Sequence, residues 1–129
     1  MVHPLVERVV RGLSERGETL SCAESCTGGL LSARLAAMPG VSAVFIGSIV
    51  AYSDRIKETF LDVSANLLKS MGAVSLPVAM KMAQGVRKKM RTSWAISITG
   101  IAGPEGGSAQ KPVGTVCFAV CGPGVEVTE

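Results

Sequence analysis

Apolar residues return at two different spacings along this chain, and each spacing predicts its own kind of element. A spacing of three to four residues predicts helices, and it is clearest between residues 75 and 91, where Val78, Met82, Val86 and Met90 fall on one face. The same spacing, with Pro, Gly or Ser at the boundaries, predicts further helices at residues 4–17, 27–38, 53–61 and 64–71.

Continuous or β-branched apolar runs lie between these helices and predict strands. The runs cover residues 18–22, 44–52, 93–100 and 113–121, and VEVTE at 125–129 has the composition of a further strand's beginning. Because strands alternate with helices, we expect one α/β domain over residues 1–129, with helices on both faces of the sheet.

Composition excludes several classes of protein. Hydrophobic residues make up 47% of the chain and charged residues 18%, which is typical of a folded domain rather than a disordered segment. The net charge of +3 is too small to indicate a nucleic-acid-binding surface. No apolar run approaches the length of a membrane span, and Glu7 and Arg8 interrupt the place where a signal peptide would be apolar. We therefore expect a cytoplasmic protein with no membrane partner.

The four cysteines fall into two pairs of equal spacing, Cys22/Cys26 and Cys117/Cys121. Four thiolates could form a zinc site, but the second pair lies in a predicted strand, where four residues span roughly 13 Å. That separation is too long for two ligands of one tetrahedral zinc. We therefore expect neither a metal nor a cofactor, and we interpret the cysteines as small buried residues.

The chain has a single histidine, His3, which lies near the N-terminus. A serine hydrolase of the Ser-His-Asp type would need an imidazole beside its nucleophile. If this protein activates a hydroxyl group, the base is a lysine, a tyrosine or a carboxylate.

Three polar, glycine-rich corners are candidates for a site: AESCTGG at 23–29, the loop at 40–42 and TGIAGPEGG at 99–107. The first and third follow apolar strands, and ligands of open α/β sheets bind beyond the carboxyl ends of strands. A helix that begins near Thr27 would offer free N–H groups to a phosphate. The known phosphate-binding glycine motifs are absent, so a plain turn remains the alternative.

Two groups of basic or phenolic residues add to this picture. Tyr52 ends a predicted strand and Lys57 lies five residues later, so both could reach one strand end, where a desolvated lysine can activate a serine. The alternative is an exposed lysine and a core tyrosine ring whose hydroxyl reaches solvent.

Four cations gather where a helix is predicted to end, which fits either a solvated helix end or a patch that contacts an anion. They are Arg87, Lys88, Lys89 and Arg91.

Five motifs occur together and in a characteristic order: AESCTGG at 23–29, AYS-x-x-x-K at 51–57, GAVS at 72–75, SITGIAGPEGG at 97–107 and KPVGTV at 111–116. In this respect the chain resembles the CinA C-terminal domain family, whose members include nicotinamide mononucleotide deamidases of the PncC type. The resemblance implies a three-layer α/β/α sandwich around a mixed sheet. The family pattern continues with another strand, a Gly-Asp-Arg segment and a C-terminal helix, which we expect this chain to lack.

The resemblance also implies an amidohydrolase that converts nicotinamide mononucleotide to nicotinic acid mononucleotide and ammonia. Its serine nucleophile matches Ser42, its tyrosine and lysine match Tyr52 and Lys57, and its threonine matches Thr99. Ser25 remains a rival nucleophile because it also lies at a strand end. The residues expected to bind the ribose and phosphate are Glu24, Ser25, Thr27, Gly28, Gly29, Gly103, Gly106 and Gly107.

Two functional hypotheses therefore stand. In the first, the chain is an enzyme acting on a small nucleotide substrate. In the second, it is a CinA-like module that binds a nucleotide or a partner protein without turnover. In either case an incompletely covered sheet would favour association into a homo-oligomer.

Overall fold

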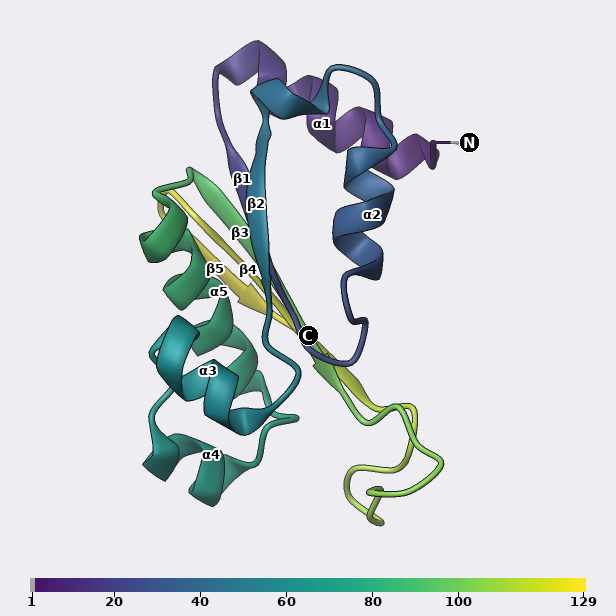
Figure 1. The fold of residues 1–129 in the computed structure, drawn as a ribbon, viewed down its shortest axis with the longest axis vertical. Coiled ribbons are helices and arrows are strands. Elements are labelled where there is room, and N and C mark those ends of the chain that lie inside the picture. Colours follow the sequence, from purple (N-terminus) through teal and green to yellow (C-terminus); the bar gives the residue numbers. More distant parts are fainter. Residues whose placement is uncertain (1) are drawn as a thin grey trace.

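A mixed five-stranded sheet forms the centre of the molecule, in the strand order β2-β1-β3-β4-β5 (Figure 1). The structure is a computed structural model and describes residues 2–129. β1 is parallel to both β2 and β3, whereas β4 is antiparallel to β3 and β5 is antiparallel to β4. The strands are β1 (Leu20–Glu24), β2 (Phe45–Val50), β3 (Trp94–Gly100), β4 (Val116–Gly122) and β5 (Val125–Thr128).

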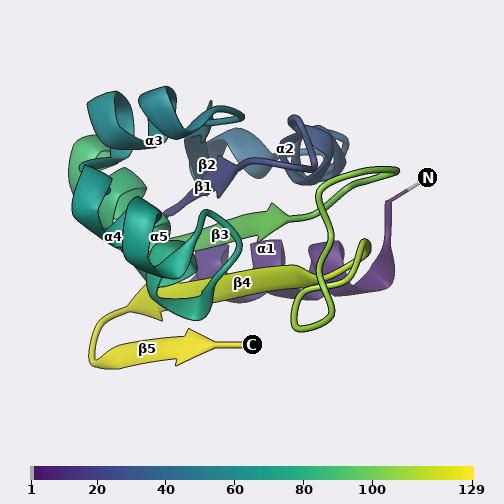
Figure 2. The ribbon, with the colours of Figure 1, turned by 90° about the horizontal axis from the view of Figure 1, so that it is seen from below.

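Helices cover both faces of the sheet, which makes the three-layer α/β/α arrangement (Figures 1 and 2). α3, α4 and α5 lie on one face, while α1 and α2 lie on the other. None of these helices is long and apolar enough to cross a membrane. Their bounds are α1 (Pro4–Arg16), α2 (Leu30–Ala36), α3 (Asp54–Leu61), α4 (Ala65–Met71) and α5 (Leu76–Met90), with a short 3₁₀ helix η1 at Val41–Ala43.

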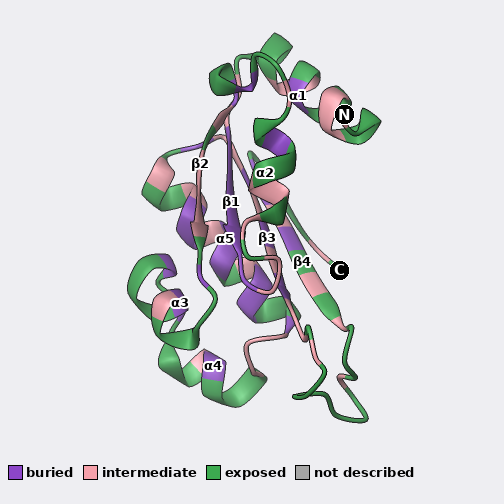
Figure 3. Cartoon of the chain, turned by 45° about the vertical axis from the view of Figure 1, so that its right-hand side comes forward, coloured by how far each residue is buried: buried purple, intermediate pink, exposed green. Residues whose placement is uncertain are grey.

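Each face of the sheet has its own hydrophobic core. On the α5 side, Val78, Met82 and Val86 are fully buried, which confirms the helix face predicted from their spacing. On the α1 and α2 side, the core joins both helices to β1 and to the start of β2. Figure 3 shows β1 and the inner face of α5 as buried and the loop after β3 as exposed.

Two predicted elements are shorter in the structure than their sequence pattern indicates. The helix expected from residue 27 begins only at Leu30, because Gly28 and Gly29 have positive φ angles of 58° and 110° and hold a turn there. The strand expected from residue 113 begins at Val116, because a turn in which the Thr115 N–H donates to the Pro112 carbonyl precedes it. The other predicted elements are present, with ends shifted by up to two residues.

A close helix contact sets the position of α3 over the sheet. The Cβ of any larger residue at Gly85 on α5 would lie 2.1 Å from the Leu61 carbonyl oxygen, so only glycine lets the end of α3 approach this closely. Leu61 and Lys57 are one turn apart on α3 and are both buried. The same packing that buries Leu61 therefore directs Lys57 inward.

The parallel order of β2, β1 and β3 brings their carboxyl ends to one edge of the sheet. Ser25 directly follows β1, residues 51–52 directly follow β2, and Gly100 ends β3. η1 precedes β2 and therefore lies at the opposite edge. This arrangement decides which of the candidate residues can meet.

Candidate active site

A serine and a lysine from neighbouring strand ends meet in the buried corner beyond β1 and β2. The Lys57 Nζ atom lies 3.0 Å from the Ser25 Oγ atom. The lysine side chain is 1% exposed and the serine 6% exposed. The sequence expectation that Lys57 leans over a strand end is met, and the hydroxyl it reaches is that of Ser25.

Backbone carbonyls fix the lysine amine in this position. Nζ donates to the Ala51 carbonyl at 3.0 Å and to the Tyr52 carbonyl at 3.3 Å. The two carbonyls and the Ser25 hydroxyl together give Nζ three hydrogen-bond partners, which is the number that a lysine amine or ammonium group can take besides its bond to the side chain. The only carboxylate near it in the described part of the chain is that of Asp54, 3.9 Å away and mostly exposed to solvent.

The surroundings of Lys57 favour its neutral form. Burial lowers the pKa of Lys57 below its ordinary value of 10.5, and the Asp54 carboxylate only partly offsets that effect. A buried lysine with a lowered pKa can accept a proton, which an exposed lysine at neutral pH rarely does. The pair therefore has the geometry and the electrostatics of a nucleophile beside its base.

Ser25 is held from the other side by β3. Its N–H donates to the Ile98 carbonyl at 2.9 Å, which continues the β1–β3 ladder by one residue. Next to it, the Thr99 side chain is buried and its hydroxyl donates to the Ala73 carbonyl at 3.0 Å. Thr99 thus lies at the same strand ends as Ser25, as expected, with its proton already engaged by the chain.

Tyr52 contributes its backbone to this corner and not its phenol. Its carbonyl accepts from Lys57, and the Ser25 hydroxyl lies 3.5 Å from the same oxygen. The side chain is 66% exposed, and no hydrogen bond joins its phenol to any residue in the part of the chain that the structure describes. The expected help of the Tyr52 phenol in moving the serine proton has no support in this geometry.

Ser42 lies far from Lys57, which overturns the expected grouping of these two residues. Ser42 is exposed on η1, at the amino end of β2, whereas Lys57 follows the carboxyl end of the same strand. Six strand residues separate the two ends, which amounts to roughly 20 Å. Of the two serines left open by the sequence, only Ser25 reaches the lysine.

Glu24 has a structural role that the sequence did not predict. Its fully buried carboxylate accepts hydrogen bonds from three backbone N–H groups and two hydroxyls of the turn and helix that follow: those of Gly29 (3.2 Å), Leu31 (3.0 Å), Ser32 (2.8 Å), the Thr27 hydroxyl (2.6 Å) and the Ser32 hydroxyl. Burial alone raises the pKa of Glu24, but these hydrogen bonds outweigh it and lower the pKa below its ordinary value. The chain's own donors occupy this carboxylate, so the expected contact between Glu24 and a substrate has no support in this geometry and stays a prediction.

The same network changes the expected role of the glycine-rich corner. The Thr27 hydroxyl and the Gly29 N–H are already bound to Glu24, so a protein carboxylate takes the place that the sequence assigned to a substrate phosphate at the start of α2. Ser32 extends the network to Ser48 on β2 through a hydroxyl contact of 2.6 Å. No sequence signal identifies Ser32, which lies eight residues beyond its partner.

The corner at Ser25 touches the end of β3, where the second glycine-rich loop begins. A Cβ at Gly100 would lie 2.9 Å from the Cys26 Sγ atom, so the two corners are in contact. Gly103 is half-buried, and Gly106 and Gly107 are exposed. The structure gives no hydrogen bond between residues 103–107 and residues 24–29, so the binding role of these three glycines stays a prediction.

Metal ligation has no candidate residues in the described chain. Residues 2–129 hold no group of three or more His, Cys, Asp or Glu side chains that could bind a metal ion. The four cysteines are free; Cys22 and Cys121 are buried as expected, whereas Cys26 and Cys117 are only half-buried.

Comparison with known proteins places this chain in a family. The family model of the CinA C-terminal domain matches residues 2–129. The chain belongs to the CinA C-terminal domain family, which confirms the resemblance drawn from its motifs.

Relatives agree with this assignment in sequence and in structure. The chain is 54% identical over 125 residues to a CinA-like protein of Parasynechococcus marenigrum (strain WH8102), which covers 96% of this chain and 30% of the relative. The competence/damage inducible protein CihA of Agrobacterium tumefaciens superposes with a TM-score of 0.94 at 39% identity, covering 97% of this chain and 76% of that one. A CinA superfamily protein of Escherichia coli has a TM-score of 0.94 at 35% identity, covering 100% and 75%. The chain thus spans less than a third of the length of the curated relatives it matches.

Proposed function

We propose that this domain is an amidohydrolase that removes ammonia from nicotinamide mononucleotide, with Ser25 as the nucleophile and Lys57 as its base. The observation that carries the proposal is the 3.0 Å contact between the buried Lys57 amine and the Ser25 hydroxyl. The pair supports nucleophilic catalysis by a serine, and the hydrolysis of an amide is what the family resemblance implies. The substrate follows from the resemblance to the nicotinamide mononucleotide deamidases of the family.

The first half of the reaction uses the neutral form of Lys57. The Ser25 oxygen attacks the carboxamide carbon while its proton passes to Nζ, and the tetrahedral intermediate carries its negative charge on the former carbonyl oxygen. The resulting ammonium of Lys57 then protonates the amide nitrogen, the C–N bond breaks and ammonia leaves. The product of this half is an ester between the pyridine carboxyl group and Ser25.

The second half repeats the proton transfers with water. Lys57 takes a proton from a water molecule, the hydroxide attacks the ester carbon, and the proton returns to the Ser25 oxygen as the C–O bond breaks. Nicotinic acid mononucleotide is released and the serine is restored. The backbone N–H groups of Cys26 and Thr27 follow the nucleophile directly and face the Cys26 sulfur. In the reaction they would donate to the oxyanion instead and stabilise it.

The experiment compares ammonia release from nicotinamide mononucleotide by the 129-residue protein and by two serine variants. Ser25→Ala should lose at least about 1,000-fold in kcat/KM, because within residues 2–129 no other hydroxyl is hydrogen-bonded to Lys57. Ser42→Ala is the matched control, since it removes a hydroxyl from the opposite end of the sheet.

The outcomes separate enzyme from binding module. Equal loss in both serine variants would reject Ser25 as the nucleophile. Saturable binding of nicotinamide mononucleotide in a calorimeter, without ammonia from the unmodified protein, would reject the enzyme and favour the non-catalytic module. Acyl-enzyme mass on the peptide that contains Ser25, but not in Ser25→Ala, would support the covalent route.

A further inference from the structure

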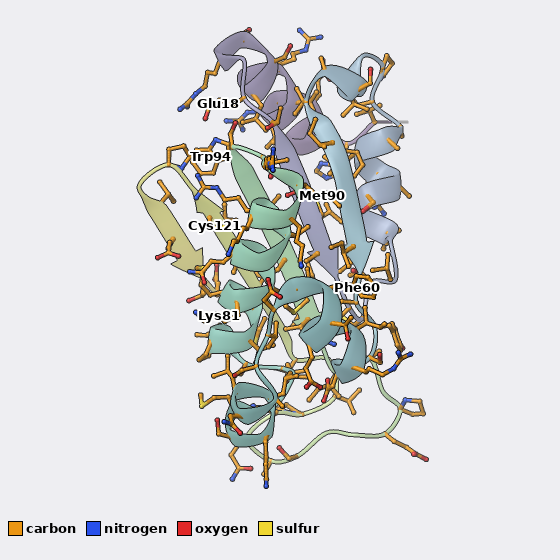
Figure 4. The ribbon with its side chains drawn as sticks, turned by 60° about the vertical axis from the view of Figure 1, so that its left-hand side comes forward. Glu18, Phe60, Lys81, Met90, Trp94 and Cys121 are labelled. Atoms are coloured by element: carbon orange, nitrogen blue, oxygen red, sulfur yellow. The ribbon has the colours of Figure 1, made fainter. Side chains whose placement is uncertain are left out.

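A second hollow lies at the opposite end of the sheet from Ser25, between the C-terminal end of α5 and the β4–β5 hairpin. Its volume is about 760 Å³. Cys121, labelled in Figure 4, lies on β4 of this hairpin and forms part of the wall. Cys121 pairs with Ala95, near the start of β3, whereas Ser25 lies beyond the strand's other end. The hollow is therefore separate from the proposed active site.

Positive charge dominates the wall of this hollow. Arg87, Lys88 and Arg91 line it, against the single carboxylate of Glu126. That carboxylate accepts a hydrogen bond from the Gln84 side-chain amide. In the part of the chain that the structure describes, none of the three cations has a carboxylate within salt-bridge distance.

Lys89 provides an internal comparison within the same helical turn. Its Nζ lies 3.8 Å from the Asp62 carboxylate, and it does not line the hollow. If these lysines served only as solvated cations at a helix end, Lys88 and Lys89 would be expected to have similar surroundings. Instead, one of the two is paired outside the hollow while the other joins a group of unpaired cations inside it.

Arg87 is held in place before any ligand arrives. Its side chain is half-buried, and its Nε donates to the Ser93 carbonyl at 2.9 Å. The remaining guanidinium N–H groups can then bind two oxygens of one anion at little entropic cost. Across from it, Gly122 and Gly124 of the hairpin contribute backbone instead of side chains to the wall.

We propose that this hollow binds a phosphorylated small molecule, whose phosphate groups contact Arg87, Lys88 and Arg91. The volume falls within the range of small-molecule sites and exceeds what a single phosphate would fill. The remainder of the ligand lies against the glycine-bearing hairpin. Thr92 is the lining residue with a hydroxyl, and that hydroxyl contacts the Ser21 hydroxyl at 2.7 Å and no lysine within the described residues. The proposal therefore concerns binding and stands apart from the proposed amidase activity.

Calorimetric titration of the 129-residue protein with sodium pyrophosphate and with ADP tests the proposal. One saturable site is expected for at least one of these two probes. Lys88→Gln and Arg91→Gln should each weaken binding about tenfold, because each removes a charged contact to phosphate. Lys89→Gln is the matched control and should change the affinity by less than about twofold. Both targeted side chains are exposed, and an unchanged circular dichroism spectrum checks that the variants fold.

The two probes also separate the sources of the phosphate chemistry. Equal affinity for pyrophosphate and ADP would assign the site to the diphosphate group alone, and tighter binding of ADP would assign it to a nucleoside diphosphate. Absence of saturable binding by both probes would overturn the proposal. So would an equal loss in Lys89→Gln, or binding of an acidic peptide at Lys88 and Arg91 by a protein that ignores both probes.

Discussion

Ser25 lies between two buried ionisable side chains whose surroundings have opposite effects on charge. Glu24, on one side, receives five hydrogen bonds from N–H and O–H donors, and its pKa is lowered so that it stays an anion. Lys57, on the other side, contacts two carbonyls and one hydroxyl, and burial lowers its pKa towards the neutral amine.

The difference shows how burial can produce either a structural charge or a chemical base. Desolvation acts against the charged form of both groups. For Glu24, the donors of the turn and α2 outweigh this cost, so the carboxylate fixes the corner that carries Ser25. For Lys57, neutral acceptors and one distant carboxylate do not outweigh it. The lysine can therefore lose and regain a proton during a reaction, whereas the glutamate stays ionised.

Replacing the chemical member of the pair should have the largest effect. Lys57→Met keeps a long apolar stem but removes the base, so the rate of ammonia release from nicotinamide mononucleotide should fall by about 100- to 10,000-fold. Lys69→Met, on the exposed side of α4, is the matched control and should keep the full rate. A Lys57→Met variant that is as fast as the control would remove Lys57 from the reaction.

Replacing the structural member should act on stability instead. Glu24→Gln puts an amide NH₂ against N–H and O–H donors. The free energy of unfolding, measured in urea, should therefore fall by about 2–3 kcal/mol. Glu7→Gln breaks only an exposed pair with Arg11 at 2.7 Å and should change stability by less than about 1 kcal/mol. Equal stability of the two variants would show that the Glu24 network is not holding this corner.

The pH dependence of the reaction tests the sign of the Lys57 effect. Ammonia release should rise with pH as Lys57 loses its proton, and its midpoint should fall below 10.5 because burial lowers the pKa. Asp54 favours the charged amine, so Asp54→Asn should move the midpoint to still lower pH. Glu58→Gln on the same helix is the control for charge at a distance. A midpoint that moves upward in Asp54→Asn would contradict the electrostatic assignment.

The same lysine links stability to pH. Because its folded pKa is below 10.5, the unfolded chain binds more protons between those two values, and folding becomes more favourable as pH rises through that window. Urea unfolding of Lys57→Met at several pH values should lack this rise. A rise of the same size in the variant would assign it to another group.

The smallest effect is expected at Ser42. Ser42→Ala changes an exposed residue on η1, at the far end of β2, so stability should change by less than about 0.5 kcal/mol. Ammonia release should stay within about twofold of the unmodified protein. A large loss of activity would restore Ser42 to the reaction and contradict the separation of the two sheet edges.

Much of the fold was predictable because its signals are periodic and local. The spacing of Val78, Met82 and Val86 predicted the buried face of α5, and the apolar run at 93–100 predicted β3. The order of the strands and the direction of each were not predictable from such local patterns. They depend on which strand pairs with which, and the pairing is a property of the folded chain.

The candidate site was predictable in part, for a geometric reason. Lys57 and Thr99 were expected at strand ends and are found there. The role of nucleophile was assigned to Ser42 through motif matching. Ser42 and Lys57 are near one another in sequence, but β2 lies between them and places them at opposite edges of the sheet. The rule that parallel strands share their carboxyl edge favours Ser25, which follows β1 directly. The role of Glu24 was missed because its partners come from a turn whose path the glycines set.

The charge state of Lys57 in the folded protein tests the central claim most directly. In protein with ¹³C-labelled lysine, the ε-carbon resonance of each lysine can be followed as pH rises. We predict that one resonance titrates well below the others and is missing from the Lys57→Met spectrum. If the resonance assigned to Lys57 instead titrates together with the exposed lysines, Lys57 is not the base of Ser25.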